Sequence, residues 1–302
     1  MKKNKLRHVR CNLCGKDSFN VYIKTKPLPD QTEERKFATT SNYVGNEQIV
    51  KCKNCGLIYV NPQIKQEEII KGYAKADEST YIKESKARAR TFAGCLKEVE
   101  KYKKPPAKLL DVGCAAGLFL NLAKMNGWEV YGVEPNKWLA EWGNKNFALK
   151  IKVCSFEKAA FPSNYFDVVT FWDVLEHLSN PKQNLKAAAK ILKRGGYLVV
   201  NYPDIGSPLA RLFGKKWWFI LSIHLYYFTP KTITMMLEKT GFKVIKIKPH
   251  IQRLSLGYLI QRLKPYSPLL YKLMKNLVEI TKLKNLEVPY YAAQTMVIAQ
   301  KK

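Results

Sequence analysis

From residue 107 onward, short apolar runs alternate with longer stretches in which apolar residues recur every three or four positions. Short apolar runs are typical of buried strands, and the longer pattern is typical of helices with one apolar face. The expected strands are 108–112, 129–133, 151–153, 166–171, 197–201, 244–248 and 290–299, and the expected helices are 118–125, 136–147, 181–192 and 231–240. This alternation predicts an α/β domain with a doubly wound, seven-stranded, mainly parallel sheet and a ligand crevice at the carboxyl ends of its strands.

Three segments of different character precede or interrupt this pattern. Residues 1–62 contain short β-like runs such as 19–23 and 48–50, which predict a small β-rich module. Residues 63–106 are expected to form a helical connector, with a long helical stretch at 81–102 and a Lys-Lys-Pro-Pro break before the main domain at 107–302. Residues 251–287 are expected to form a helical insertion of one or two amphipathic helices. Such an insertion can pack on the domain, act as a substrate lid or touch a membrane surface, and we favour the first two.

Four cysteines form two Cys-x-x-Cys pairs, each followed by glycine: Cys11 and Cys14, then Cys52 and Cys55. Each such turn points two thiolates at one ion, and two turns complete a tetrahedral zinc site. A redox role for one pair is the alternative, but the repeated arrangement favours metal. Residues 15–51 separate the pairs, so a β-rich insert must loop out between them. Because four thiolates leave no open coordination position, the zinc is expected to be structural.

The most informative stretch is Leu109–Phe119, a turn of small residues between a strand and a helix. Small residues let the backbone pass close beneath a ligand, and a helix N-terminus offers free N–H groups. Glu134 ends the next strand, where a carboxylate can accept hydrogen bonds from both hydroxyls of a ribose. The glycine spacing does not match a pyrophosphate-binding turn, because Ala115 and Leu118 stand where the second and third glycines belong. A nicotinamide site is therefore not expected.

Here the chain resembles the class I S-adenosylmethionine-dependent methyltransferases, whose first motif is Asp/Glu-x-Gly-x-Gly-x-Gly. Asp111, Gly113 and Gly117 match this motif, and Ala115 replaces its middle glycine. The segments 166–177 and 192–198 are similar to the family's fourth-strand and fifth-strand motifs. The resemblance implies a Rossmann-like methyltransferase fold over 107–248 and the final strand.

The resemblance also implies the cofactor contacts. The turn 113–117 holds the amino-acid part of S-adenosylmethionine, Asp111 supports that turn and Glu134 binds the ribose. Ser155 and Phe156 lie beside the adenine, and Trp172 and Asp173 border the methyl group. Phe156 and Trp172 can equally be core aromatics, and Asp167 is expected to be structural.

Methyl transfer to an oxygen usually needs a base, and histidine is suited to this near neutral pH. His224 lies in the segment 216–230, between the fifth strand and the next helix, where this fold places its acceptor. The His-Leu-Tyr-Tyr-Phe-Thr run resembles a signature of methyltransferases of sugar and small-molecule pathways. His177, at the end of the fourth-strand motif, is the second candidate base. A histidine beside aromatics is also often a hydrogen-bonded core residue. Further pocket candidates are Tyr202, Asp204 and Tyr226, whereas His8 and His250 are expected outside the pocket.

The chain contains 52 lysines and arginines against 24 aspartates and glutamates, for a formal net charge of +28. Such a charge attracts anionic partners, although the lysines are scattered as on an ordinary solvated surface. No apolar run approaches the roughly 20 residues that span a bilayer. Seven cysteines without an apparent export signal favour a reducing cytoplasm.

The sequence therefore predicts methyl transfer to a hydroxyl of a sugar, nucleotide sugar or glycan precursor. Similarity to sugar methyltransferases with an N-terminal zinc module supports this order of domains. The first alternative is an RNA methyltransferase, drawing on the charge and the cysteine knuckles, but nucleic acid is not the favoured partner. The second is a non-catalytic zinc-ribbon interaction protein with a degenerate cofactor domain.

Overall fold

The computed structural model describes residues 6–27, 37, 43–76, 79–264 and 267–302. Part of the expected insert between the cysteine pairs, 28–36 and 38–42, lies outside the described residues. The helices are α1 (Gln66–Lys75), α2 (Ser79–Lys83), α3 (Ser85–Val99), α4 (Leu118–Met125), α5 (Lys137–Phe147), α6 (Pro181–Ile191), α7 (Pro208–Phe213), α8 (Pro230–Glu238), α9 (Leu256–Gln261) and α10 (Pro268–Ile280). The strands are β1 (Leu6–Arg7), β2 (Phe19–Lys24), β3 (Gln48–Cys52), β4 (Ile58–Val60), β5 (Gln63–Ile64), β6 (Lys108–Val112), β7 (Glu129–Glu134), β8 (Ile151–Val153), β9 (Phe166–Trp172), β10 (Leu192–Pro203), β11 (Tyr226–Tyr227), β12 (Phe242–Ser255) and β13 (Glu287–Lys301).

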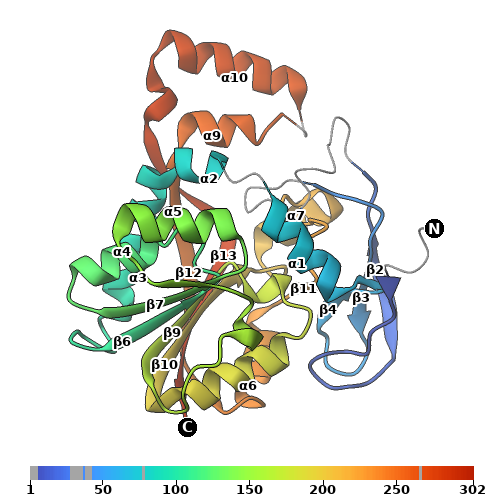
Figure 1. Cartoon of the computed structure of the whole chain (residues 1–302). Coiled ribbons are helices and arrows are strands. Elements are labelled where there is room, and N and C mark those ends of the chain that lie inside the picture. Colours follow the sequence, from blue (N-terminus) through green and yellow to red (C-terminus); the bar gives the residue numbers. More distant parts are fainter. Residues whose placement is uncertain (1–5, 28–36, 38–42, 77–78, 265–266) are drawn as a thin grey trace.

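The centre of the molecule is a seven-stranded sheet of order β12-β13-β10-β9-β6-β7-β8, which confirms the expected fold class (Figure 1). The strands β8, β7, β6, β9 and β10 run parallel, and β13 runs antiparallel between β10 and β12. Every residue of β9 is buried, because helices cover both faces of the sheet there. The strand order reverses between β6 and β9, and ligands of open α/β sheets bind at such a reversal.

Helices cover the two faces of the sheet in separate groups. Buried residues of α3, α4 and α5 share one apolar cluster with one face, whereas those of α6 and α8 pack on the other face. The helix starts follow local chemistry. The side chain of Asn136 accepts a hydrogen bond from the backbone N–H of Leu139, as its expected role as an N-cap requires. Thr229 and Thr232 form a reciprocal capping box at α8, and Pro230 occupies its first turn.

The N-terminal segment folds as a second, four-stranded antiparallel sheet of order β11-β4-β3-β2. Its edge strand β11 comes from residues 226–227, far along the chain, where Tyr226 pairs with Tyr59 and Tyr227 with Ile58. The expected β-rich module therefore exists, but its sheet is completed by the main domain. The long helix expected at 81–102 is instead split into α2 and α3 and ends at Val99.

The helical insertion between the last two strands is shorter than the expected range of 251–287. The β12–β13 hairpin continues past the sheet, from Phe242 paired with Lys301 to Ser255 paired with Glu287. Antiparallel pairing therefore occupies the first residues of this stretch, and the helices begin at Leu256. Figure 1 shows α9 and α10 at the end of this hairpin, with α9 nearer to the rest of the molecule and α10 on the outside.

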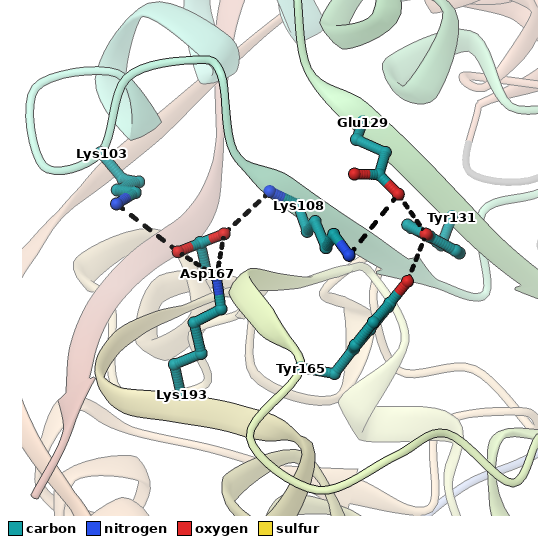
Figure 2. A network of polar contacts seen from close by, with 7 residues as sticks. All are labelled: Lys103, Lys108, Glu129, Tyr131, Tyr165, Asp167 and Lys193. Atoms are coloured by element: carbon teal, nitrogen blue, oxygen red, sulfur yellow. Dashed lines mark hydrogen bonds and ion pairs between the residues drawn. The ribbon is translucent and has the colours of Figure 1, made fainter.

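A network of polar contacts ties the sheet together at the edge where β6 begins (Figure 2). The carboxylate of Asp167 accepts hydrogen bonds from the backbone N–H of Lys108 at 2.9 Å and from the ammonium of Lys193 at 3.0 Å. The ammonium of Lys103 lies 3.5 Å from the same carboxylate. Burial raises the pKa of Asp167, but these donors outweigh that effect and hold its pKa below the usual range. Asp167 is thus structural, as expected.

We expect Asp167→Asn to lower the free energy of unfolding by about 1–3 kcal/mol at pH 7, because an amide replaces an acceptor of charge-assisted hydrogen bonds. The carboxylate with a depressed pKa contributes stability above its unfolded-state pKa and loses it as the pH falls. The difference between variant and wild type should therefore shrink below about pH 4. Urea unfolding at several pH values measures it, and a gap that persists unchanged at low pH would contradict this account.

Candidate functional site

A cavity of about 660 Å³ lies at the carboxyl ends of β6, β7 and β9, where the strand order reverses. Cavities that hold cofactors and drug-sized ligands have volumes of about 300–1,000 Å³. The turn after β6 and the end of β7 form one side, and residues of α1, α3, the segment before β11 and the helical insertion form the other. Of the nine cofactor residues expected from the sequence, eight line the cavity: Asp111, Gly113, Ala115, Glu134, Ser155, Phe156, Trp172 and Asp173. Gly117 does not.

The turn after β6 is held by the neighbouring strand. The backbone N–H of Gly113 donates to the carbonyl of Val133 at 2.8 Å. The carboxylate of Glu134 accepts from the N–H of Ala115 at 2.9 Å and from the N–H of Asn136 at 2.8 Å. A carboxylate can accept about four hydrogen bonds, so Glu134 can hold the turn and still bind the hydroxyls of a ribose.

Asp111 lies beneath the turn and is 2% exposed. It accepts a hydrogen bond from the hydroxyl of Thr170 at 2.7 Å. Burial, helped by the nearby Glu134 carboxylate, raises the pKa of Asp111 to about 8 against the lowering effect of Thr170. A cationic ligand in the cavity would favour the charged form of both acids. The residues present therefore fit a cofactor that carries a sulfonium and an ammonium group.

The aromatic residues expected beside the cofactor occupy different sides of the cavity. Phe156 packs edge-on against Phe171, with ring centroids 5.8 Å apart. Trp172 packs against Phe92, Phe119 and His250, and among the described residues its indole N–H has no hydrogen-bond partner. Both rings are therefore partly core, as the alternative interpretation allowed, and both also face the cavity.

Asp173 follows Trp172 at a left-handed backbone position with φ of 54°. Its carboxylate accepts hydrogen bonds from the side-chain amides of Asn201 and Gln294. Burial raises the pKa of Asp173 to about 6, whereas Asn201, the Arg88 charge and Gln294 lower it.

Both candidate catalytic histidines line the cavity, with ring centroids 4.7 Å apart. The Nδ1 atom of His224 lies 2.8 Å from the carbonyl of Phe219, and Nδ1 of His177 lies 3.1 Å from the carbonyl of Ile223. Burial lowers the pKa of His177 to about 4 and that of His224 far below its usual value. Both rings are therefore neutral at pH 7 and able to accept a hydrogen bond or to bind a metal ion.

The remaining pocket candidates lie elsewhere. Tyr202, Asp204 and Tyr226 are buried but do not line the cavity among its described residues. Their side chains pack in the core beneath the site, where Tyr202 contacts Phe228 and the hydroxyl of Tyr226 donates to the carbonyl of Ser179. His8 pairs with Asp17 at the surface, and His250 packs against Trp172 outside the cavity, as expected.

The structure adds cavity residues that were not expected from the sequence. Arg88 of α3 lies 4.7 Å from the ring of Tyr81 and close enough to Asp173 to lower its pKa. Arg262 of the insertion also lines the cavity, beside Tyr258. Glu176 is 1% exposed and also borders the cavity. In the sequence, Arg88 could have been recognised as a cavity residue only because it is a basic residue within the apolar stripe of its helix.

The Sγ atoms of the four cysteines in the two Cys-x-x-Cys pairs all lie within 4.8 Å of one another. The Sγ atoms of Cys11 and Cys55 are 3.4 Å apart, and those of Cys14 and Cys52 are 3.6 Å apart. A tetrahedral zinc with Zn–S bonds of about 2.3 Å requires sulfurs about 3.8 Å apart, so the four thiols fit such an ion closely. In both turns the glycine N–H bonds back to the carbonyl of the first cysteine, at 2.8 Å and 3.0 Å.

Comparison with known proteins identifies the cavity's chemistry. A family model described as a methyltransferase domain matches residues 84–247, more than half of the chain. The chain belongs to this methyltransferase family. The matched residues carry the turn, Glu134 and the end of β9, and they form an S-adenosylmethionine-dependent methyltransferase domain. This match favours an enzyme over a non-catalytic zinc-ribbon protein.

The matches to curated relatives cover about half of this chain. An uncharacterized methyltransferase of Schizosaccharomyces pombe is 34% identical over 149 residues, which cover 45% of this chain and 53% of the relative. The mitochondrial ubiquinone biosynthesis O-methyltransferase of Mus musculus is 29% identical over 168 residues, covering 50% and 45%. The chain thus spans about half the length of these relatives. A methyltransferase structure from Archaeoglobus fulgidus matches with a TM-score of 0.52 at 23% identity, covering 74% of this chain and all of that one, which shows the shared fold.

The turn after β6, which is expected to hold the cofactor, offers two substitutions with opposite expected effects. Ala115 has a φ of 49°, a conformation that costs a residue with a Cβ roughly 1–2 kcal/mol. We expect Ala115→Gly to raise the free energy of unfolding by up to about 1 kcal/mol, after the greater chain entropy of glycine is subtracted, and to keep cofactor binding. At Gly113 a Cβ would lie 2.7 Å from Cγ2 of Val174, so Gly113→Val should abolish cofactor binding.

Calorimetric titration with S-adenosylmethionine and thermal unfolding measure both effects, and the metal content of the cysteine site is the control for folding. Normal cofactor affinity in Gly113→Val would contradict the placement of the site.

Proposed function

We propose that this methyltransferase transfers the methyl group to a hydroxyl of a small ring-shaped acceptor, with a sugar, nucleotide sugar or glycan precursor as the favoured class. The observation that carries the proposal is the pair His177 and His224 in the cavity wall. Both rings are neutral and can accept a hydrogen bond from the hydroxyl of an acceptor, which would orient its oxygen. A phenolic ring is the second candidate, favoured by the relatives named as ubiquinone biosynthesis O-methyltransferases.

The cavity offers two cationic positions for the two ligands. Arg88 stands beside Tyr81, which is itself near Asp111, Cys114 and Glu134, so it belongs to the cofactor end. Its Nε atom is buried and has no hydrogen-bond partner in the described part of the chain. Arg88 is therefore placed to bind the carboxylate of S-adenosylmethionine. Arg262, beside Tyr258 and near His224, is placed to bind an anionic group of the acceptor.

Bound S-adenosylmethionine supplies an electrophilic methyl group on a sulfonium that leaves as a neutral thioether. The protein's residues have to align the acceptor oxygen with that methyl and exclude water. Glu134, Arg88 and the turn 113–117 fix the donor. Trp218, Phe219 and Tyr290 line the acceptor side and offer ring faces against which a sugar or aromatic ring can pack.

The helical insertion supports a role as a lid. Leu259, Leu263 and Met274 of the insertion line the cavity, so its movement would open or close the acceptor side. The outer face of α10 exposes Leu269, Leu273, Leu277 and Ile280, which also suits a peripheral membrane contact. Among the described residues no helix has the length and hydropathy to cross a membrane. We favour the lid.

The cysteine site is proposed to hold a structural zinc ion, because four thiolates leave no open position for chemistry. An RNA acceptor is less favoured. A base would have to be flipped into a cavity that the insertion partly covers, whereas a small molecule can diffuse in when the lid opens.

The test of the proposed function has two steps. Calorimetry should detect S-adenosylmethionine binding by the wild type, and a labelled-methyl screen of nucleotide sugars, glycan precursors and phenols should find an acceptor. Labelling of RNA alone, with affinity that falls steeply as salt is raised, would replace the proposed acceptor class by nucleic acid.

The role of Arg88 has its own test. Arg88→Met removes a charge-assisted hydrogen bond to the cofactor carboxylate, worth about 1.5–3 kcal/mol, so the dissociation constant for S-adenosylmethionine should rise about 10- to 100-fold. Arg90→Met on the same helix is the matched control, because Arg90 faces outward and pairs with Glu287 at 3.0 Å. Equal affinities in the two variants would remove Arg88 from the cofactor site.

A further inference from the structure

Three metal-ligating side chains converge in the wall of the cavity, apart from the cysteine site. Glu176 and His177 lie in the short 3₁₀ helix Leu175–His177, directly after β9, and His224 lies just before β11. Their ligand atoms are all within 4.8 Å of one another. All three side chains line the cavity.

The carboxylate of Glu176 is the unusual member of this group. Its side chain is 1% exposed, and within the described ranges neither of its oxygens has a hydrogen-bond partner. A buried ionised carboxylate costs several kcal/mol unless a cation or hydrogen-bond donors compensate it. Asp173 is close enough to add repulsion. The site therefore lacks a positive partner of its own.

The two imidazoles are oriented as metal ligands usually are. A backbone carbonyl can only accept a hydrogen bond, so Nδ1 of His224 donates to Phe219 at 2.8 Å, which leaves the lone pair on Nε2 of this ring. Nδ1 of His177 lies 3.1 Å from the carbonyl of Ile223 and 2.8 Å from the hydroxyl of Tyr73. His177 can take the same tautomer as His224, with Nδ1 donating to Ile223 and Nε2 as the metal ligand. A carbonyl that accepts from one ring nitrogen is the usual support of a histidine that binds metal through the other.

A purely structural cluster would look different. If Glu176 served only to anchor a histidine, a hydrogen bond or ion pair between its carboxylate and one of the rings would be expected at this distance. Among the described residues the hydrogen bonds and ion pairs include none between Glu176 and either histidine. The ligand atoms of Glu176, His177 and His224 thus lie close together, but Glu176 is not hydrogen-bonded to either histidine in the described part of the chain.

We propose that Glu176, His177 and His224 bind a divalent first-row transition-metal ion, which takes the acceptor oxygen at an open coordination position. Two imidazoles and one carboxylate are a donor set of catalytic zinc sites and suit related borderline ions, whereas Mg²⁺ and Ca²⁺ prefer oxygen ligands alone. Three protein ligands leave at least one position open. This inference rests on the proposed function and specifies how the acceptor hydroxyl is activated.

The chemical consequence is a change in the role of the histidines. A hydroxyl bound to such a cation loses its proton to water more readily, because the cation stabilises the alkoxide or phenolate. The oxygen then forms a bond to the methyl carbon while the carbon–sulfur bond breaks, and the electron pair of that bond goes to sulfur. The products are the methyl ether and neutral S-adenosylhomocysteine, with one proton released to solvent. The imidazoles hold the ion and need not themselves remove the proton.

The two metal sites can be distinguished by their donor atoms. Co²⁺ in the cysteine site gives intense thiolate-to-metal absorption in the near ultraviolet, whereas Co²⁺ on nitrogen and oxygen ligands gives only weak visible bands. Mn²⁺ prefers nitrogen and oxygen ligands to thiolates, so loss of the free Mn²⁺ resonance reports on the proposed site. Each ion is added alone to the full-length protein after dialysis against a chelator.

We expect wild-type protein to bind one Mn²⁺ and to hold a second, thiolate-ligated metal. Glu176→Gln keeps the shape of the side chain but removes a charged ligand, so Mn²⁺ affinity should fall about 100-fold while the Co²⁺–thiolate absorption stays. Glu157→Gln is the matched control, because Glu157 borders the same cavity outside the cluster, and its Mn²⁺ affinity should stay within about twofold of the wild type. Once an acceptor is known, methyl transfer by the chelated enzyme should recover on addition of metal.

Two results would overturn the proposal: equal Mn²⁺ affinity in the wild type and Glu176→Gln, or full methyl transfer by the wild type with this site empty. Failure of the proposed function is separately visible. A protein that binds Mn²⁺ through Glu176 but gives no heat with S-adenosylmethionine would retain the metal site and lose the methyl donor.

Discussion

The hydrogen bond from Ala115 to the carboxylate of Glu134 is the contact on which the cofactor site depends. It joins the turn after β6 to the end of β7 at 2.9 Å, while Asn136 binds the second oxygen of the same carboxylate. One side chain thus fixes the path of the turn, the end of the neighbouring strand and the start of α5. The small residues of the turn make this approach possible, because larger side chains would hold the two strands' ends apart.

The charges around this contact explain how a basic protein can bind a cationic cofactor. The chain carries a net charge of +28, yet Asp111, Glu134, Asp173 and Glu176 all border one cavity, and three of them are almost fully buried. Low dielectric surroundings strengthen their attraction for cations. The exterior therefore favours anionic partners, whereas the interior favours a sulfonium, an ammonium or a metal ion. Arg88 and Arg262 are the two arginines among the described lining residues, and each can attract an anionic group of a ligand.

The sequence predicted the limits of those helices and strands in which apolar residues recur at the spacing typical of the element. Strand β6 and helix α4 have the limits expected from the apolar pattern, because β6 is buried on both faces and α4 buries one stripe. Strand β8 also has its expected limits, although only Ile151 is buried. The outer halves of β12 and β13 lie beyond the sheet and bury little, so no apolar alternation marked them as strands. Arg88 was missed because a charged residue on a helix is usually solvated, and only the packing of α3 over the sheet turns it inward. Glu176 was missed because its neighbour His224 is far along the chain, and no local pattern reports that contact.

The cysteine module explains how that distant contact is held. Strand β11 pairs with β4, and the backbone N–H of Val60 donates to the carbonyl of Leu225 at 2.9 Å. The N–H of Leu225 in turn donates to the carbonyl of Glu176 at 2.8 Å. Leu225 therefore connects the N-terminal sheet to the end of β9 and fixes His224, its immediate neighbour, against Glu176 and His177. Because β4 begins at Ile58, shortly after Cys55, a metal ion bound by the cysteine turns would also stabilise the strand that positions His224. The N-terminal module thus supports the part of the cavity wall to which His224 belongs.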